Sequence, residues 1–222
     1  KYDPIPASDY YRFTATFAPK GIAQSVRFIQ VNQNGTFFNS DIAPQIGYQP
    51  GGELSSRQER RKRGLPEKDL MPPLERDCTA KCADSYLNNN ADWVMVESVI
   101  STSPDQIAIA PGALLREWQE NGRRFFHYKL DRPSANFYSF LSARYTVARQ
   151  VHNGINTEVY YHAEHPWNVP KMMTSIQQSL DYFIRNFGPY HHRQARIIEF
   201  PRVSSFAQAF PGTMPYSESI GF

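Results

Sequence analysis

The stretch Asn121-Gly-Arg-Arg-Phe-Phe-His-Tyr128 decides the fold class. Asn-Gly is the dipeptide that two-residue hairpin turns favour, because both turn positions need a positive φ angle, and the aromatic residues after it suit a strand. The same dipeptide recurs at Asn34-Gly35 and Asn153-Gly154. Runs with strand character lie around these turns, at Tyr11–Phe17, Ile22–Val31, Asp92–Ile100, Asp105–Ala110, Phe137–Val147 and Glu158–Tyr161. We therefore predict a mainly β chain, with an all-β sandwich or saddle over residues 1–155.

The composition is that of a folded protein with little net charge. Of the 222 residues 14% are aromatic and 20% charged, which supplies a core and excludes disorder as the overall state. The formal net charge of +3 is too small for a dedicated nucleic-acid binder. The longest apolar runs, such as Ile107–Ala110, fall far short of the roughly 20 residues of a membrane helix. No stretch has the pattern of a signal peptide. The chain begins with Lys1 and not with Met, and its end at Ser-Ile-Gly-Phe222 resembles an interior segment, so we expect a piece of a larger protein.

The pattern changes in the last third of the chain. Apolar residues recur at steps of three and four from Met173 to Phe187, which predicts an amphipathic helix. Gly188-Pro189 predicts its end. A predicted strand at Arg196–Phe200 follows the helix. We therefore predict that residues 156–222 begin an α+β region that is too short to close a core of its own.

An irregular insert separates the first strands from the later ones. Between about residues 41 and 90 the apolar periodicity fades and Pro, Gly and charged residues accumulate, with one short helix predicted near Ser55–Arg63. The basic run Arg57-Gln-Glu-Arg-Arg-Lys-Arg63 is either a phosphate-contacting segment or a solvated helix face. The near-neutral charge balance and the lack of aromatic neighbours for bases favour the solvated face.

The two cysteines, Cys78 and Cys82, form a Cys-x3-Cys pair. Three states stay open from the sequence: a small-loop disulfide if the chain is exported, two free thiols, or half of a metal site. A zinc site would need two further ligands, and none lies close in sequence.

The sequence contains no complete active site by motif. His162-Ala-Glu-His165 has i, i+3 histidines at the end of a predicted strand, whereas helical metal ligands use i, i+4 spacing, so we predict no metal site there. His191-His192 follows a helix end, where solvated histidines are common. The Gly-x-Ser-x-Gly, Ser-x-x-Lys, Gly-x-x-x-x-Gly-Lys and His-Glu-x-x-His motifs are absent from these 222 residues.

Several segments nevertheless resemble one family. They are Ser101–Gly112, Phe137–Tyr145, Glu158–His162, Arg196–Arg202 and Phe206–Phe222. They resemble the peptidase region of bacterial membrane proteins that join an ABC-transporter permease to an aminopeptidase N-like zinc metallopeptidase. The resemblance is dense over residues 91–222 and looser over residues 1–60. It implies a β-saddle domain over residues 1–155, followed from residue 156 by the start of a thermolysin-like catalytic domain.

The resemblance also implies a substrate-binding segment. Family members carry a Gly-x-Met-Glu-Asn strand whose Glu binds the free α-amine of the peptide, while its backbone pairs with the peptide as an added strand. The matching positions here are Gly212, Met214 and Glu218. The pattern departs from the family because Pro215-Tyr-Ser217 separates Met214 from Glu218 and Ser219 replaces the Asn. A second amine contact is expected just after a saddle hairpin, at Asn39 or Asp41.

The catalytic groups of the family are expected outside this sequence. Its zinc ligands belong to a His-Glu-x-x-His helix and a later Glu, so the resemblance implies zinc in the larger protein, and neither a metal site nor peptidase activity in this segment alone. The implied partners are peptide N-termini, the rest of the catalytic domain and a membrane permease region, on the extracytoplasmic side of the membrane, with no nucleic acid. The alternative is a non-catalytic saddle that serves a transporter as a recognition or docking module.

Overall fold

The structure is a computed structural model that describes residues 30–32, 35–39, 54–68, 93–164, 166–202 and 205–220. The predicted strand at Tyr11–Phe17, most of Ile22–Val31, and the residues Asp41, Cys78 and Cys82 lie outside these ranges. The described chain is mainly β, with several sheets and two helices, which confirms the predicted fold class. Among the described residues, no helix combines the length and the apolar character needed to cross a membrane.

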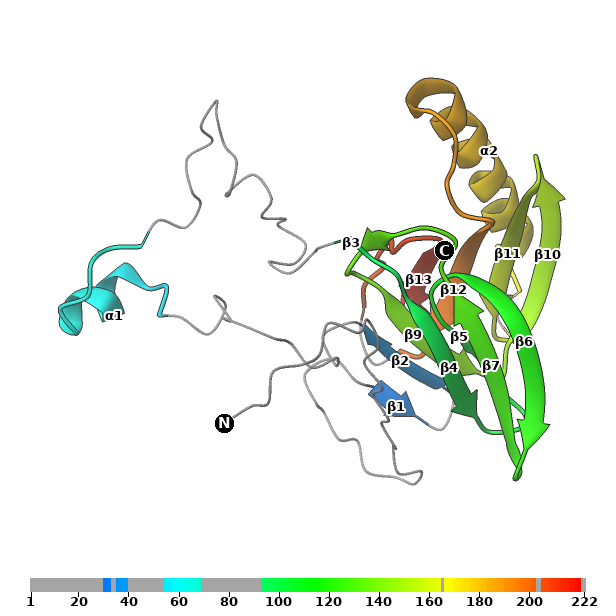
Figure 1. Cartoon of the computed structure of the whole chain (residues 1–222), viewed down its shortest axis with the longest axis horizontal. Coiled ribbons are helices and arrows are strands. Elements are labelled where there is room, and N and C mark those ends of the chain that lie inside the picture. The colour runs from blue at the N-terminus through cyan, green and yellow to red at the C-terminus, as the bar shows by residue number, and fades with distance from the viewer. Residues whose placement is uncertain are drawn as a thin grey trace.

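One antiparallel sheet has the strand order β1-β2-β9-β5 (Figure 1). A hairpin is present near the predicted Asn34-Gly35, because β1 and β2 pair antiparallel, but Asn32 lies opposite Gly35, so Gly35 is the first residue of β2 and not a turn residue. Strand β9 then pairs antiparallel with both β2 and β5. The bounds are β1 (Gln30–Asn32), β2 (Gly35–Asn39), β5 (Ile107–Ile109) and β9 (Ser139–Ala143).

A second antiparallel sheet contains the hairpin that decided the fold class. Its order is β4-β7-β6, and a separate pair joins β3 to β8. Asn121 and Gly122 have φ angles of 49° and 72°, so the predicted turn between β6 and β7 is confirmed. The bounds are β3 (Trp93–Val94), β4 (Glu97–Thr102), β6 (Ala113–Glu120), β7 (Arg123–Lys129) and β8 (Ser134–Ala135).

The C-terminal sheet is mixed and has the order β10-β11-β12-β13. Strands β10 and β11 form the predicted hairpin, with Asn153 and Gly154 at positive φ. Strand β12 is parallel to β11, and β13 is parallel to β12, so helix α2 is the crossover of a β-α-β unit. The bounds are β10 (Thr146–His152), β11 (Ile155–Tyr161), α2 (Val169–Phe187), β12 (Gln194–Phe200) and β13 (Thr213–Ser217).

Helix α2 covers one face of this sheet, packing on β11 and β10 (Figure 1). Its buried residues Val169, Met173, Ile176 and Leu180 follow the predicted 3–4 spacing and lie in one hydrophobic cluster with Val159 of β11. The helix ends where predicted, at Gly188, whose φ of 112° favours glycine.

The opposite face of the C-terminal sheet packs on the β1-β2-β9-β5 sheet. Tyr160 of β11 and Ile198 of β12 lie in one cluster with Phe37 of β2 and Leu141 of β9. Side chains alternate along a strand, so successive residues of β11 and β12 point alternately toward α2 and toward the β1-β2-β9-β5 sheet. Coverage on both faces explains why β12 is an almost unbroken buried run.

Two predicted strands are each divided in the structure. Asp92–Ile100 separates into β3 and β4, because β3 pairs with β8 whereas β4 pairs with β7. Between the two strands, the carbonyl of Val96 accepts a hydrogen bond from the Leu130 N–H at 2.9 Å. Phe137–Val147 separates into β9 and β10, which belong to different sheets. The change occurs at Arg144-Tyr145. Periodicity could not reveal it because apolar and polar residues alternate across the break.

The domain boundary predicted at residue 155 stays a prediction. It falls at the turn between β10 and β11, two strands of one sheet. The short helix predicted near Ser55–Arg63 is confirmed as α1 (Arg57–Lys62). Ser56 caps it by accepting the Glu59 N–H, and no residue of α1 is buried. The exposed position agrees with the solvated-face interpretation of the basic run.

A buried arginine connects the sheets. Arg196 of β12 is 4% exposed, and its guanidinium donates to Glu158 Oε2 at 2.8 Å and to the carbonyl of Gly112 at 3.0 Å. Glu158 also accepts from the Tyr160 hydroxyl at 2.9 Å and from Arg149 at 3.0 Å. Burial raises the pKa of Glu158, but the charge of Arg196 and these hydrogen bonds outweigh burial and hold that pKa below its usual value.

Glu158→Gln tests this network. The substitution leaves the buried Arg196 without an anionic partner, so we expect a loss of about 3 kcal/mol in the free energy of unfolding at pH 7. Since the folded pKa of Glu158 is depressed, its stabilisation is present above the usual pKa of 4.5 and is lost as the pH falls through the folded value. Urea titrations from pH 7 to pH 3 should show this acid-dependent loss in the wild type and not in the variant. Equal stability of the two proteins at pH 7 would contradict the proposed role; the exposed Glu120→Gln is the control.

A second prediction concerns Gly112, at the turn before β6. Its φ is +93°, and a Cβ there would collide with the backbone carbonyl of Lys129. Gly122 also has a positive φ, +72°, but a Cβ would meet nothing within 4 Å. We therefore expect Gly112→Ala to lower the free energy of unfolding by at least about 3 kcal/mol, against about 1 kcal/mol for Gly122→Ala. Similar losses in chemical denaturation would show that the close approach at Gly112 does not matter.

Candidate functional site

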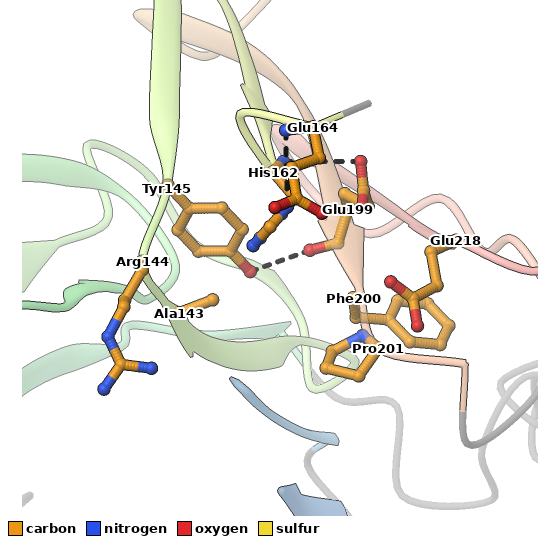
Figure 2. Close-up of a pocket in the computed structure, with 9 residues that line it drawn as sticks. All are labelled: Ala143, Arg144, Tyr145, His162, Glu164, Glu199, Phe200, Pro201 and Glu218. Atoms are coloured by element: carbon orange, nitrogen blue, oxygen red, sulfur yellow. Dashed lines mark hydrogen bonds between the residues drawn. The ribbon is translucent and has the colours of Figure 1, made fainter. Parts of the chain in front are cut away.

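A pocket of about 170 Å³ opens beside the C-terminal sheet (Figure 2). Strands β11, β12 and β13 run parallel to one another, so their carboxyl ends meet at one edge of the sheet. Ligand sites of sheets with parallel strands commonly lie outside such ends. The lining residues are Ala143, Arg144, Tyr145, His162, Glu164, Glu199, Phe200, Pro201 and Glu218.

The pocket gathers three carboxylates from three strand ends. Glu164 follows β11, Glu199 is the second-last residue of β12, and Glu218 follows β13 directly. The one arginine in the lining, Arg144, is ion-paired with Asp105, and Figure 2 shows its guanidinium pointing away from the carboxylates. The arrangement therefore favours a cationic group.

Glu199 is the buried member, 4% exposed. Its Oε2 accepts from the Tyr216 hydroxyl at 3.1 Å and lies 3.5 Å from the His162 backbone nitrogen. Its backbone carbonyl accepts from the Tyr145 hydroxyl at 2.8 Å. Burial raises the pKa of Tyr216, and the neighbouring charge of Glu199 raises it further, so this phenol stays a donor to the carboxylate throughout the physiological range.

Glu218 is half-buried at the side of the pocket. Its backbone N–H donates to the carbonyl of Phe200 at 3.0 Å, which continues the β12–β13 pairing by one residue. Its Oε1 accepts from the backbone N–H of Arg202 at 2.7 Å. The carboxylate is thus held in place by backbone and keeps capacity for a ligand, because each carboxylate oxygen accepts two hydrogen bonds.

Of the other predicted substrate-binding residues, the three that the structure describes, Gly212, Met214 and Asn39, do not line this pocket. Gly212 precedes β13, at the opposite end of the strand from Glu218. Met214 lies on the helix side of β13 and lines a different hollow. Gly35 of β2 pairs with Ala143, which lines the pocket. Asn39 lies four residues further along β2, about 13 Å from Gly35, and pairs with Ser139.

That second hollow is an apolar groove of about 550 Å³ between α2 and β13. It lies over the part of the sheet that α2 leaves uncovered, and its walls include Met172, Ile197 and Met214. Its lining has none of the acidic residues that characterise the first pocket.

The outer edge of β13 is covered by a preceding part of the same chain. The Gln208 N–H donates to the carbonyl of Pro215 at 3.1 Å, and the Ser217 N–H donates to the carbonyl of Phe206 at 3.0 Å. Phe210 and Thr213 exchange hydrogen bonds across the turn. Residues 206–217 are therefore a hairpin with β13 as its second strand.

The described residues offer no ligand set for zinc. No three His, Cys, Asp or Glu side chains among them are arranged to hold a metal ion. His162 lines the acidic pocket, while His165 lies outside the described residues. Zinc in the larger protein stays a prediction.

Sequence reasoning identified Glu218 and missed Glu199 as a pocket residue. A signal for Glu199 existed: it is a carboxylate that directly follows the apolar pair Ile197-Ile198 near the end of a mostly buried strand, where a charged side chain needs partners. No family model matches this chain, and no curated protein is significantly similar to it.

Tyr216→Phe tests how Glu199 is held. Removal of the hydroxyl leaves the buried carboxylate with one donor fewer, so we expect the free energy of unfolding to fall by about 2 kcal/mol. Tyr182 on α2 is 62% exposed, and Tyr182→Phe should change stability by less than about 0.5 kcal/mol. Denaturant titrations of both variants provide the comparison. An unchanged Tyr216→Phe protein would mean that the hydroxyl does not stabilise Glu199.

Proposed function

We propose that this chain is the N-terminal part of an aminopeptidase N-like zinc metallopeptidase, and that its acidic pocket binds the free α-amine of a peptide. The observation that carries the proposal is the position of Glu218. The residue selected by resemblance lies in a pocket together with two further carboxylates, Glu199 and Glu164. In this proposal residues 1–155 form the β-saddle and residues 156–222 begin the catalytic domain.

The chemistry of the pocket suits an ammonium group. An α-ammonium presents three N–H donors, and charge-assisted hydrogen bonds to carboxylates are about twice as strong as neutral ones. Two carboxylates on different strands, Glu199 and Glu218, fix the position of the amine from two directions. A fixed amine fixes the distance to the first peptide bond, which is how a peptidase selects that bond for attack.

Hydrolysis itself is assigned to the rest of the larger protein. In the proposal a zinc ion there supplies the activated water, and this chain alone neither binds zinc nor cleaves peptides. The proposed setting is the extracytoplasmic face of a membrane protein, with the permease region and the remaining catalytic domain as partners.

One observation favours the second candidate, a non-catalytic docking module of a transporter. The peptide-binding strand of the family pairs with its substrate, whereas the outer edge of β13 is already paired with residues 206–208. Pro215 in this strand also lacks the N–H that such pairing uses.

Binding of amines to the full 222-residue chain tests the proposed pocket. We expect alanine amide to bind and N-acetylalanine amide not to bind in isothermal titration calorimetry, because acetylation removes the charge. Glu218→Gln should weaken binding of alanine amide at least 10-fold, since hydrogen bonds to charged groups are worth about 1.5–3 kcal/mol. The exposed Glu120→Gln should bind like the wild type.

Equal binding of the free and acetylated amides would contradict amine recognition. The choice between enzyme and docking module needs the longer gene product. A downstream His-Glu-x-x-His motif with chelator-sensitive release of aminoacyl anilides would support the peptidase. A folded product with amine binding, no such motif and no turnover would favour the docking module.

A further inference from the structure

The backbone of β13 forms hydrogen bonds on two sides, with β12 on one side and with residues 206–210 on the other. The Gly212 carbonyl accepts from Arg196 N–H and the Glu218 N–H donates to the Phe200 carbonyl, so even-numbered residues face β12. Backbone groups alternate along a strand, so residues 213, 215 and 217 face the outer edge. Under the proposed function, a peptide that added to β13 as a strand would need this edge, because the other edge is paired with β12.

Residues 206–210, which we call the covering segment, occupy that edge. They reach it through the turn Pro211-Gly212, in which Gly212 has a φ of +69°. The outward carbonyl of Pro215 accepts a hydrogen bond from the Gln208 N–H, and the outward N–H of Ser217 donates to the carbonyl of Phe206. The nitrogen of Pro215 faces this edge and not β12, so its missing N–H removes no hydrogen bond from the β12–β13 pairing.

Aromatic packing anchors both ends of the covering segment. The Phe206 ring lies 5.0 Å from the ring of Phe200 and 5.5 Å from that of Phe37, centroid to centroid. The Phe210 ring stacks on Phe137 at 4.4 Å, and Phe210 is 7% exposed. Removing the segment from the edge would expose these rings, so a weakly bound peptide cannot displace it.

We propose that the covering segment restricts recognition to the N-terminal residue of the ligand. The inference rests on the proposed function of the pocket and adds its substrate class: amino-acid amides and peptides bind through their α-amine and first residue, and the following backbone adds no strand to β13. Affinity is therefore independent of peptide length.

Binding by strand addition and binding through the N-terminal residue alone predict different changes of affinity with peptide length. Each backbone hydrogen bond of an added strand would raise affinity about fivefold. With the edge covered, alanine amide and its di-, tri- and tetra-alanine amide homologues should bind the full chain within about twofold of one another. N-methylation of the second residue should change their affinity by less than twofold as well.

The variant Gln208→Pro removes the N–H that bonds to Pro215, and Gln208→Ala keeps it. We expect both variants to retain the flat length series, because the packing of Phe206 and Phe210 keeps the segment on the edge when one hydrogen bond is lost. A tenfold rise in affinity with length in the wild type, abolished by N-methylation, would overturn the inference while leaving amine binding intact.

Absence of binding by every amide would instead contradict the proposed function, and with it the inference about recognition. Amide hydrogen exchange then still tests whether the covering segment occupies the edge. The Gln208 and Ser217 N–H groups should exchange at least 100-fold more slowly than in an unstructured chain, because both are bonded in the hairpin. Exchange of both at the unstructured rate would show that the edge is open and would overturn the inference.

Discussion

The burial of one charged group, the Arg196 guanidinium, constrains the arrangement of the sheets. A buried cation is tolerated only with an anionic partner and satisfied donors, and Arg196 finds these in Glu158 of β11 and in the carbonyl of Gly112 before β6. The β11–β12 register and the position of the β4-β7-β6 sheet are therefore fixed together. Tyr128 of that sheet also places its ring 5.6 Å from the guanidinium.

The position of the pocket follows from that register. Parallel pairing of β11, β12 and β13 brings their carboxyl ends to one edge, and each end contributes a carboxylate. The carboxylates are not equivalent, because Glu199 is buried and held by Tyr216 whereas Glu218 lies half-buried at the side (Figure 2). An acidic pocket whose carboxylates are held by hydrogen bonds is suited to bind a small cation, which is what the proposed amine recognition requires.

Local sequence patterns predicted the elements that depend on local chemistry. The Asn-Gly turns at Asn121-Gly122 and Asn153-Gly154, helix α2 and its Gly188 end, and the short helix α1 all follow from turn geometry and 3.6-residue periodicity. The division of Phe137–Val147 into strands of two sheets could not be predicted, because only the partners of β9 and β10, distant in sequence, distinguish them. Glu199 was missed for the same reason: its neighbours in the pocket come from other strands. Glu218 was found through resemblance, not through its spacing.

A crystal structure of the full chain with alanine amide tests the central claim most directly. The claim predicts the ligand ammonium within about 3 Å of carboxylate oxygens of both Glu218 and Glu199, with residues 206–208 still paired to β13. Density for the amide at another place on the protein, with the acidic pocket empty at saturating ligand, would contradict it.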